Sequence, residues 1–411
     1  MRLKNPIINP SEHIPDTEVH VMPDGRAYIY GSYDEKDCKW GSDKYKVYST
    51  KDMEDIIDHG VSLHLSQLNN PNARLLYAPD CIYNNGKYYL YICCEDDTEW
   101  VAEASKPWGP FTKCTKIEGI KGIDPAVFID DGIVYYFWGQ FSLNGCILNN
   151  DMCTIKENSI VNEIITQEKH YFHEGISMRK RNGIYYLTFS DVSRGKKTEY
   201  GGVPTCIGYA TSKNPFGPFT YRGVIVDSAA CDPKSWNNHG SIEEIEGQWY
   251  VFYHRSSRNS EANRRCCCEK IYFDEEGLIK EVPMTSSGAN DYLNACDVVF
   301  DGALACGFDK CYNGLNGKHE SVFVLAEDAS AVYRWIKFDD EKNAEMHACG
   351  VGVVQLIFKH EKEEIVLTEV NFDGKHNVIS ASLNEISGMG ELILKFKAIE
   401  GFCFDRLIFY K

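Results

Sequence analysis

The sequence predicts an all-β protein, a five-bladed β-propeller followed by a jelly-roll-like β-sandwich. Three observations predict this fold class. A unit made of a turn glycine and an aromatic-rich alternating strand occurs five times, with the glycines at positions 25, 86, 132, 183 and 247. Units of roughly 40–50 residues or slightly more, each holding several strands, are typical of propeller blades. Long helical periodicity is nearly absent, and the repeat ends after PMTSSG, around residues 283–288.

Each unit is predicted to contain a hairpin. Asn-Gly and Asp-Gly dipeptides before an alternating strand favour a type I′ turn, which needs positive φ at its central residues. A second strand candidate precedes each hairpin, and the five are HIPDTEVHVM, RLLYAPDCIY, GIDPAVFID, FHEGISMRKR and WNNHGSIEEIE. We expect these to be the innermost strands, with their starts converging on one mouth of the propeller axis.

The chain divides into two predicted domains. Residues 1–288 hold the five repeats and form the propeller, and residues 289–411 form the second domain. The second domain has shorter alternating strands at regular spacing, namely SVFVLA, VVQLIF, ELILKFK and DRLIFY. Alternating strands between regular turns indicate a β-sandwich.

Composition excludes several classes of function. Of the 411 residues, 43% are hydrophobic and 25% charged, which is ordinary for a globular protein. The net charge of −17 argues against nucleic acid and against anionic membranes as partners. Aromatic residues reach 13%, which favours strands and surfaces that stack on flat ligands such as sugar rings.

The cysteines and the first residues predict a cytoplasmic protein. Seventeen cysteines, with a doublet at 93–94 and a triplet at 266–268, suit reduced and packed thiols better than a disulfide framework. The opening MRLKNPIINP contains no apolar stretch of signal-peptide length, and no run approaches a membrane span.

Acids and one histidine stand in a repeating register just before the five hairpins. A single one of them could merely mark a turn, but five in register indicate one shared axial cavity. A ring of carboxylates raises the pKa of some members by repulsion and partial burial, as acid and base chemistry requires. The residues are Asp16, Asp80, Asp124, Glu174 and His239.

At these motifs residues 5–288 resemble glycoside hydrolase family 43, whose members are five-bladed propellers with an axial active site. The resemblance implies that Asp16 in HIPDTEV is the general base and Glu174 in FHEGIS the general acid. Asp124 in GIDPAVFIDDG would orient Glu174 and keep it protonated. One departure is Thr17, where the family often has a second proline.

Those residue types suit inverting hydrolysis. An inverting pair needs a base and an acid on opposite faces of the sugar, with carboxyls roughly 6.5–9.5 Å apart so that a water fits between them. Opposite blades of a propeller supply such a gap. Asp80, in the LYAPD block, is expected to be a scaffold residue and no catalyst.

Three further residues are candidates for binding. His239 in NNHGSIEE matches a block in which, by the resemblance, the imidazole lies near an axial calcium ion, although a hydrogen-bonded axial histidine is an equal alternative. Arg264, a better match than Arg265, would reach the hydroxyls of the terminal sugar, and a surface arginine is the alternative. Trp138 could form an aromatic wall of the subsite or a packed propeller aromatic.

The C-terminal stretch from AVYRWIKFDD to FCFDRLIFYK resembles, more weakly, the β-sandwich of family 6 carbohydrate-binding modules. Sugar binding by such modules needs exposed aromatic side chains in loops. Trp335, Phe338 and Phe402 lie within apparent strands, so we expect a structural or accessory sandwich.

The resemblance implies an exo-acting glycoside hydrolase, a β-xylosidase or α-L-arabinofuranosidase that releases xylose or arabinofuranose from short xylo- or arabinoxylo-oligosaccharides. An arabinanase or a galactosidase of the same fold is an alternative. A non-catalytic sugar-binding propeller is a further one, but it would not need both Asp16 and Glu174. We expect an oligosaccharide partner, calcium as the one candidate cofactor, and no organic cofactor. The sequence leaves the oligomeric state open.

Overall fold

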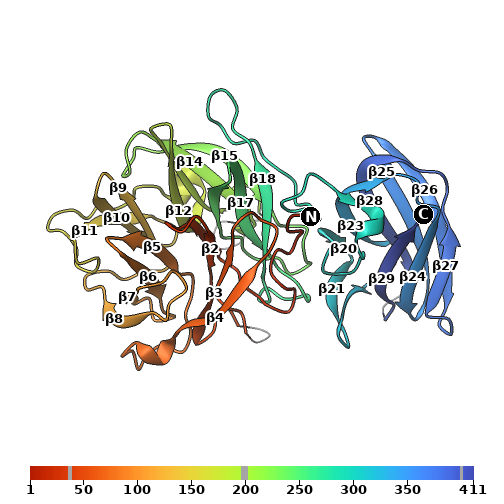
Figure 1. Cartoon of the computed structure of the whole chain (residues 1–411), viewed down its shortest axis with the longest axis horizontal. Coiled ribbons are helices and arrows are strands. Elements are labelled where there is room, and N and C mark those ends of the chain that lie inside the picture. Colours follow the sequence, from red (N-terminus) through yellow and green to blue (C-terminus); the bar gives the residue numbers. More distant parts are fainter. Residues whose placement is uncertain (36–38, 196–201, 399–400) are drawn as a thin grey trace.

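The computed structural model describes residues 1–35, 39–195, 202–398 and 401–411. Figure 1 shows two bodies side by side, the first coloured red through green and the second teal and blue. Within these residues the secondary structure is almost entirely β. The helical elements of the described ranges are one α-helix, α1 (Gln167–His170), and two 3-10 turns, η1 (Leu65–Gln67) and η2 (Ala295–Asp297). None of the described helices is both long and apolar enough to span a membrane.

The first body consists of five antiparallel sheets, each built from consecutive strands, which are the five blades. Blade one holds β1 (Glu18–Val21), β2 (Ala27–Tyr30), β3 (Lys44–Thr50) and β4 (Ile57–His64), and blade two holds β5 (Asp80–Asn84), β6 (Lys87–Cys93), β7 (Glu99–Ala104) and β8 (Thr112–Lys116). Blade three holds β9 (Ala126–Asp130), β10 (Ile133–Trp138) and β11 (Asn144–Leu148). Blade four holds β12 (Phe172–Arg181), β13 (Ile184–Asp191), β14 (Cys206–Ser212) and β15 (Thr220–Asp227), and blade five holds β16 (Ser241–Ile245), β17 (Gln248–Arg255) and β18 (Arg265–Ile271).

The innermost strands are β1, β5, β9, β12 and β16, as the sequence predicts. Each lies beside the next around the axis, and β1 lies beside β16, so the ring is closed. A parallel bridge between Thr17 and Gly240 joins the first blade to the fifth. The five-bladed propeller is therefore confirmed.

Four of the five predicted hairpin turns have positive φ at both central residues. The φ of Asn85 is 48° and that of Gly86 is 83°, for example, and the turns at residues 131–132, 182–183 and 246–247 agree. The first hairpin differs, because only Gly25 of its dipeptide is left-handed and a longer loop joins β1 to β2. The sequence pattern thus predicted the hairpin there but not its turn type.

The second body is a β-sandwich of two sheets, as predicted. One sheet has the order β19-β23-β28-β25-β26, with β20 on the edge of β23, and the other has the order β21-β22-β29-β24-β27. Phe338 and Phe402 are buried in the core between the sheets. The strands are β19 (Leu293–Asn294), β20 (Gly307–Asp309), β21 (Cys311–Asn316), β22 (His319–Val324), β23 (Ala329–Phe338), β24 (Asn343–Cys349), β25 (Val351–His360), β26 (Glu363–Asp373), β27 (Val378–Ser382), β28 (Gly388–Ala398) and β29 (Cys403–Tyr410).

Packed contacts join the two bodies. Arg265 at the start of β18 donates to the Glu320 carboxylate of β22 at 2.8 Å, and both side chains are largely buried. Arg334 of β23 donates to the backbone oxygen of Met284 at 3.0 Å. The connecting residues 285–288 are themselves buried. The domain boundary at 288–289 remains a prediction, and the segment that contains it is packed against both bodies.

Candidate active site

A cavity of about 430 Å³ opens at the end of the propeller axis where the innermost strands begin. Five of the six residues that the sequence singles out for the site line it. They are Asp16 before β1, Asp124 before β9, Glu174 in β12, His239 before β16 and Arg264 before β18. Four of them lie at or near the start of an inner strand and Arg264 lies between β17 and β18, so closing the ring of blades is what brings them together.

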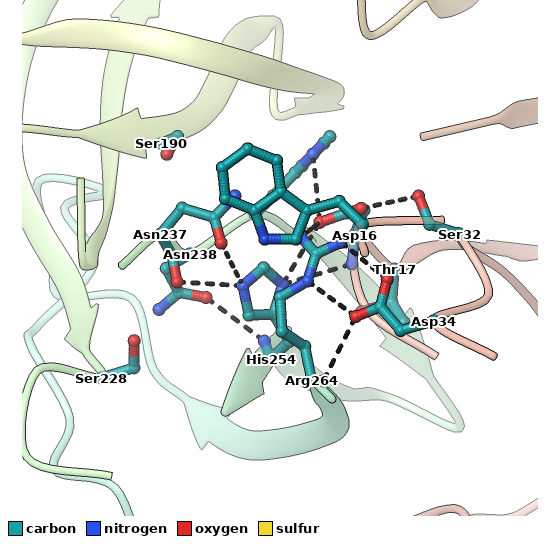
Figure 2. A network of polar contacts seen from close by, with 12 residues as sticks. Asp16, Thr17, Ser32, Asp34, Ser190, Ser228, Asn237, Asn238, His254 and Arg264 are labelled. Carbon is teal, nitrogen blue, oxygen red and sulfur yellow. Dashed lines mark hydrogen bonds and ion pairs between the residues drawn. The ribbon is translucent and has the colours of Figure 1, made fainter. Parts of the chain in front are cut away.

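Asp16 is buried in a network of ion pairs and hydrogen bonds. Arg264 donates to its Oδ1 at 2.8 Å and Ser32 to its Oδ2 at 2.6 Å. Figure 2 shows Arg264 and His254 both directed at this carboxylate. Burial alone would raise the pKa of Asp16, but Arg264 and then His254 outweigh it and hold that pKa well below its usual range. Asp16 is therefore an ionised carboxylate at neutral pH.

Arg264 is itself fixed by a second acid. Its Nε and Nη2 donate to the two oxygens of Asp34 at 2.9 and 3.1 Å, while Nη1 donates to Asp16. The guanidinium is almost fully buried, which excludes the alternative of a surface arginine. Its planar fork is thus engaged by two carboxylates, and the residue also lines the cavity.

The pKa of Asp124 is shifted in the opposite direction to that of Asp16. Burial, and then the negative charges of Glu174 and Asp16, raise the pKa of Asp124 well above its usual range. Asp124 also has a left-handed backbone, with φ of 57°, as does Asp16 with φ of 56°. Strained backbone at non-glycine residues gathers at functional sites, where the surrounding structure holds it. Asp124 is thus a buried carboxyl of raised pKa that faces the charges of Glu174 and Asp16.

Glu174 is held by neutral amides. Gln140, from the loop after β10, donates to its Oε2 at 2.8 Å, and Asn237 donates to its Oε1 at 3.4 Å. The imidazole of His173 lies 3.7 Å from Oε2. These two amide donors orient the Glu174 carboxyl without adding a formal positive charge.

His239 lies between the two aspartates, with its Nδ1 at 3.8 Å from Asp16 Oδ1 and at 3.8 Å from Asp124 Oδ2. Burial lowers the pKa of His239 against the opposing charge of Asp16, so the ring is neutral at pH 7. Its ring packs on Gly175, where an added Cβ would meet three ring atoms at 2.7 Å. The φ of Gly175 is 63°, so both space and backbone conformation require glycine after Glu174.

His254 and Asn237 were missed by sequence reasoning, and they link the two ends of the site. The backbone amide of Asp16 donates to His254 Nδ1 at 3.3 Å, and His254 Nε2 contacts the backbone oxygen of Asn237 at 2.9 Å and its Oδ1 at 3.1 Å (Figure 2). The Asn237 side chain then reaches Glu174. The only signal in the sequence was a histidine at the end of the fifth hairpin strand and an asparagine doublet before His239.

Trp138 does not line the cavity, and the prediction of an aromatic wall at this residue is wrong. Its side chain points to the same face of β10 as Tyr136 and packs in the core between blades two and three, against Gly122. Among the described residues, the aromatic wall consists of Trp40, Tyr77, Phe141 and Trp236. All four lie in loops, so the alternation of residues along strands could not predict that they face the cavity.

Asp80 lies outside the cavity and joins neighbouring blades. Its Oδ2 accepts from the Val127 amide at 2.7 Å and its Oδ1 accepts from the Cys81 amide at 2.6 Å. His20 of β1 contacts Oδ1 at 2.8 Å. These contacts to blades one, two and three fit the scaffold role expected of Asp80.

Comparison with known proteins finds a family whose members this chain resembles. Residues 3–279 match Glycosyl hydrolases family 43. A protein named xylosidase/arabinosidase from Thermoclostridium stercorarium is 32% identical over 371 residues, which cover 76% of this chain and 74% of the relative.

Two solved structures are also similar. The first is a GH43 β-xylosidase/α-arabinofuranosidase from a compost microbial metagenome, in complex with xylotriose and in a calcium-free form. It is 29% identical with a TM-score of 0.58, over 69% of this chain and 98% of that one. The second is a family 43 arabinoxylan arabinofuranohydrolase from Bacillus subtilis in complex with cellotetraose, with a TM-score of 0.57 at 20% identity. It covers 98% of this chain and 96% of its own, so the similarity of fold extends through the sandwich.

Proposed function

Because this chain belongs to glycosyl hydrolases family 43, we propose that it is an exo-acting glycosidase that releases xylose or arabinofuranose from short xylo- or arabinoxylo-oligosaccharides. The observation that carries the proposal is the division of charge in the cavity. Asp16 is held ionised by Arg264, while burial and the charges of Glu174 and Asp16 raise the pKa of Asp124 well above its usual range. A base and an acid in one cavity are the two groups that glycoside hydrolysis needs.

In the proposed mechanism Asp16 accepts a proton from the attacking water, and Glu174 protonates the oxygen of the leaving sugar. Asp124 would act through its proximity to Glu174, because two carboxyls that repel each other are not readily ionised together. Gln140 and Asn237 orient the Glu174 carboxyl. The water would attack from the face opposite the leaving group, so the configuration at the anomeric carbon inverts.

The choice of pentose rests on the names of the relatives. The relative from Thermoclostridium stercorarium is named xylosidase/arabinosidase, and the metagenomic structure is in complex with xylotriose. An oligosaccharide is therefore the expected substrate.

The proposal is tested with a panel of nitrophenyl glycosides and with xylotriose. We expect hydrolysis of the β-xyloside and the α-L-arabinofuranoside, little hydrolysis of galactosides, and release of xylose from xylotriose. Proton NMR should show that the first-formed sugar has inverted configuration. A panel without pentoside hydrolysis contradicts the substrate assignment, and net retention contradicts the assigned roles of Asp16 and Glu174.

We also propose that His239 is a ligand of a calcium ion in the cavity. A neutral imidazole between two carboxylates, in a cavity lined by four acids, is a set of groups that suits a cation. Calcium prefers six to eight oxygen ligands, so water would supply most of its shell. When bound, the ion would supply positive charge that lowers the pKa of the neighbouring carboxyls.

Two readouts test the calcium proposal. We expect added calcium to raise the melting temperature of chelator-treated protein and to raise its activity on the β-xyloside. His239→Ala should remove the thermal shift, whereas His319→Ala, in the sandwich, should leave it. An unchanged melting temperature of the wild-type protein would contradict calcium binding.

We further propose that the protein works in the cytoplasm. Every cysteine within the described residues is a free thiol, including the buried triplet at 266–268, which supports a reducing compartment. Cell fractionation with an antibody to the chain tests this proposal, and recovery outside the cytoplasm contradicts it.

A further inference from the structure

Trp335 of β23 combines a strained backbone with an exposed indole. Its φ is 63°, a conformation that is a true outlier for a bulky residue. It lies at a register shift between Arg334 and Ile336, so the strand bulges there and directs the side chain away from the sheet. The side chain is 36% exposed, although Ile336 beside it is fully buried. Strain of this kind persists where the surrounding structure holds it, and it is often found at ligand sites.

The indole lines a groove between the propeller and the sandwich. This groove has a volume of about 210 Å³ and is also lined by Tyr272, Lys270, Asn290 and Asp291. A second hollow of about 530 Å³ shares the last three of these residues and adds Tyr292, so the two form one continuous depression. We call it the junction groove. Among the described residues, its lining has none in common with the catalytic cavity.

The junction groove has the chemistry of a site for a neutral, hydroxyl-rich chain. Three aromatic side chains lie along it, and Tyr272 and Tyr292 are 57% and 41% exposed. Exposed aromatic rings present apolar faces with polar edges, which suits stacking on sugar rings. Lys270 and Asp291 pair at 2.7 Å, so they supply hydrogen-bonding groups with no net charge. A polyanion would need a basic surface, and the chain as a whole carries −17.

We propose that the junction groove is a second, non-catalytic binding site for a neutral glycan chain, with Trp335 and Tyr272 as stacking platforms. The occupant is a xylan-type oligosaccharide or polysaccharide, a choice that rests on the function proposed above. The site lets the protein hold a long substrate at a place separate from the one where bonds are cleaved. This assignment gives the sandwich a part in sugar binding, whereas its sequence indicated a structural role.

Affinity electrophoresis through gels that contain soluble arabinoxylan tests the proposal on the full chain. We expect the glycan to retard the wild-type protein, and Trp335→Gly and Tyr272→Ala each to weaken apparent affinity at least fivefold. Both variants should hydrolyse nitrophenyl β-xyloside within twofold of wild type, because that substrate fills only the catalytic cavity. Tyr410→Ala, which removes an exposed ring at the end of β29, is the matched control and should be retarded like wild type.

Thermal unfolding separates binding from structure. Glycine adopts the φ of residue 335 without strain, so Trp335→Gly should not lower the melting temperature if the indole serves a ligand. A lowered melting temperature with unchanged glycan affinity would make Trp335 a packing residue and overturn the proposal. Absence of retardation of the wild-type protein would also overturn it. If instead the proposed function is wrong, the wild-type protein hydrolyses none of the pentosides but is still retarded by arabinoxylan.

Discussion

At the scale of single residues, the site is arranged around charges that are paired unequally. Asp16 shares Arg264 with Asp34, whereas Asp124 and Glu174 have no cation among their described hydrogen-bond partners. A buried charge is tolerated when it is paired and hydrogen-bonded, and otherwise the group takes up a proton. The same cavity therefore holds an ionised carboxylate, Asp16, and a carboxyl of raised pKa, Asp124, and this difference supports the role of Asp16 as the base.

The role of Glu174 can be tested through the leaving group. A poor leaving alcohol depends on protonation as the bond breaks, and general acid catalysis contributes roughly 10²–10⁴-fold. We expect Glu174→Ala to lose far more activity on xylotriose than on an aryl xyloside with an activated leaving group. Asp16→Ala should be impaired on both substrates, because each reaction needs the same activated water.

Steady-state kinetics on the two substrates measures this difference. Glu244→Ala is a suitable control, since Glu244 lies on inner strand β16 but is exposed to solvent. If the dependence on leaving group appeared in Asp16→Ala and not in Glu174→Ala, the assignment of acid and base would be reversed.

The ion pair of Asp16 predicts a shift in the pH profile. Arg264 holds the pKa of Asp16 low, and Asp16 must be ionised to act as a base, so activity falls as the pH drops through that pKa. Removing the guanidinium in Arg264→Met raises the pKa, so the acidic limb of kcat/KM should move to higher pH by roughly 1–3 units.

The measurement is kcat/KM for nitrophenyl β-xyloside from the lowest pH at which both proteins stay folded up to pH 9, with the wild-type limb expected at the acidic end. Arg258→Met serves as the control, because Arg258 lies near Glu320 and not near Asp16. An acidic limb that stays in place in Arg264→Met would show that Asp16 is not the base.

At the scale of elements, regular features were predictable and irregular ones were not. Alternation and turn dipeptides predicted all five inner strands and hairpins, because both follow from local backbone preferences. Strand alternation could also have placed Trp138, which shares its face of β10 with buried Tyr136. The link from His254 through Asn237 to Glu174 joins residues from separate segments, so only the closed ring reveals it. The resemblance to a family supplied the roles of Asp16 and Glu174, which no local pattern implies.

The bulge at Gly175 is the irregular element on which the site depends most directly. Register shifts flank Glu174 in its pairing with β13, and the His239 ring packs on Gly175. In Gly175→Ala the new Cβ must displace the imidazole, in addition to about 1–2 kcal/mol of left-handed strain. We therefore expect loss of stability together with a large loss of kcat.

Gly183→Ala is the matched control, because Gly183 has φ of 78° and nothing within 4 Å of an added Cβ. It should cost only the backbone strain and leave kcat unchanged. Urea unfolding and kinetics on both variants measure the difference. Equal behaviour of the two variants would mean that contact with His239 is unimportant.

At the scale of the whole molecule, buried polar contacts tie the chain ends and the two bodies together. Asn5 donates to the backbone oxygens of Cys268 and Thr285 and to Glu269, and it accepts from the Cys268 amide. The first residues therefore fasten the fifth blade to the segment that leads into the sandwich. Because residues 285–288 are buried, this connection is a packed joint and differs from the exposed, flexible linkers that usually separate domains.

The pair Arg265–Glu320 gives this joint a measurable energy. Removing one partner of a buried ion pair leaves an uncompensated charge and costs about 3–5 kcal/mol. We expect Glu320→Ala to lower the free energy of unfolding of the full chain by about that amount, because Arg265 is almost fully buried. Glu369→Ala, which breaks a half-exposed pair with Lys397, should cost less than about 1 kcal/mol. Urea unfolding followed by tryptophan fluorescence gives both values. A Glu320→Ala loss no larger than that of Glu369→Ala would mean that the Arg265–Glu320 pair adds little to the joint between the two bodies.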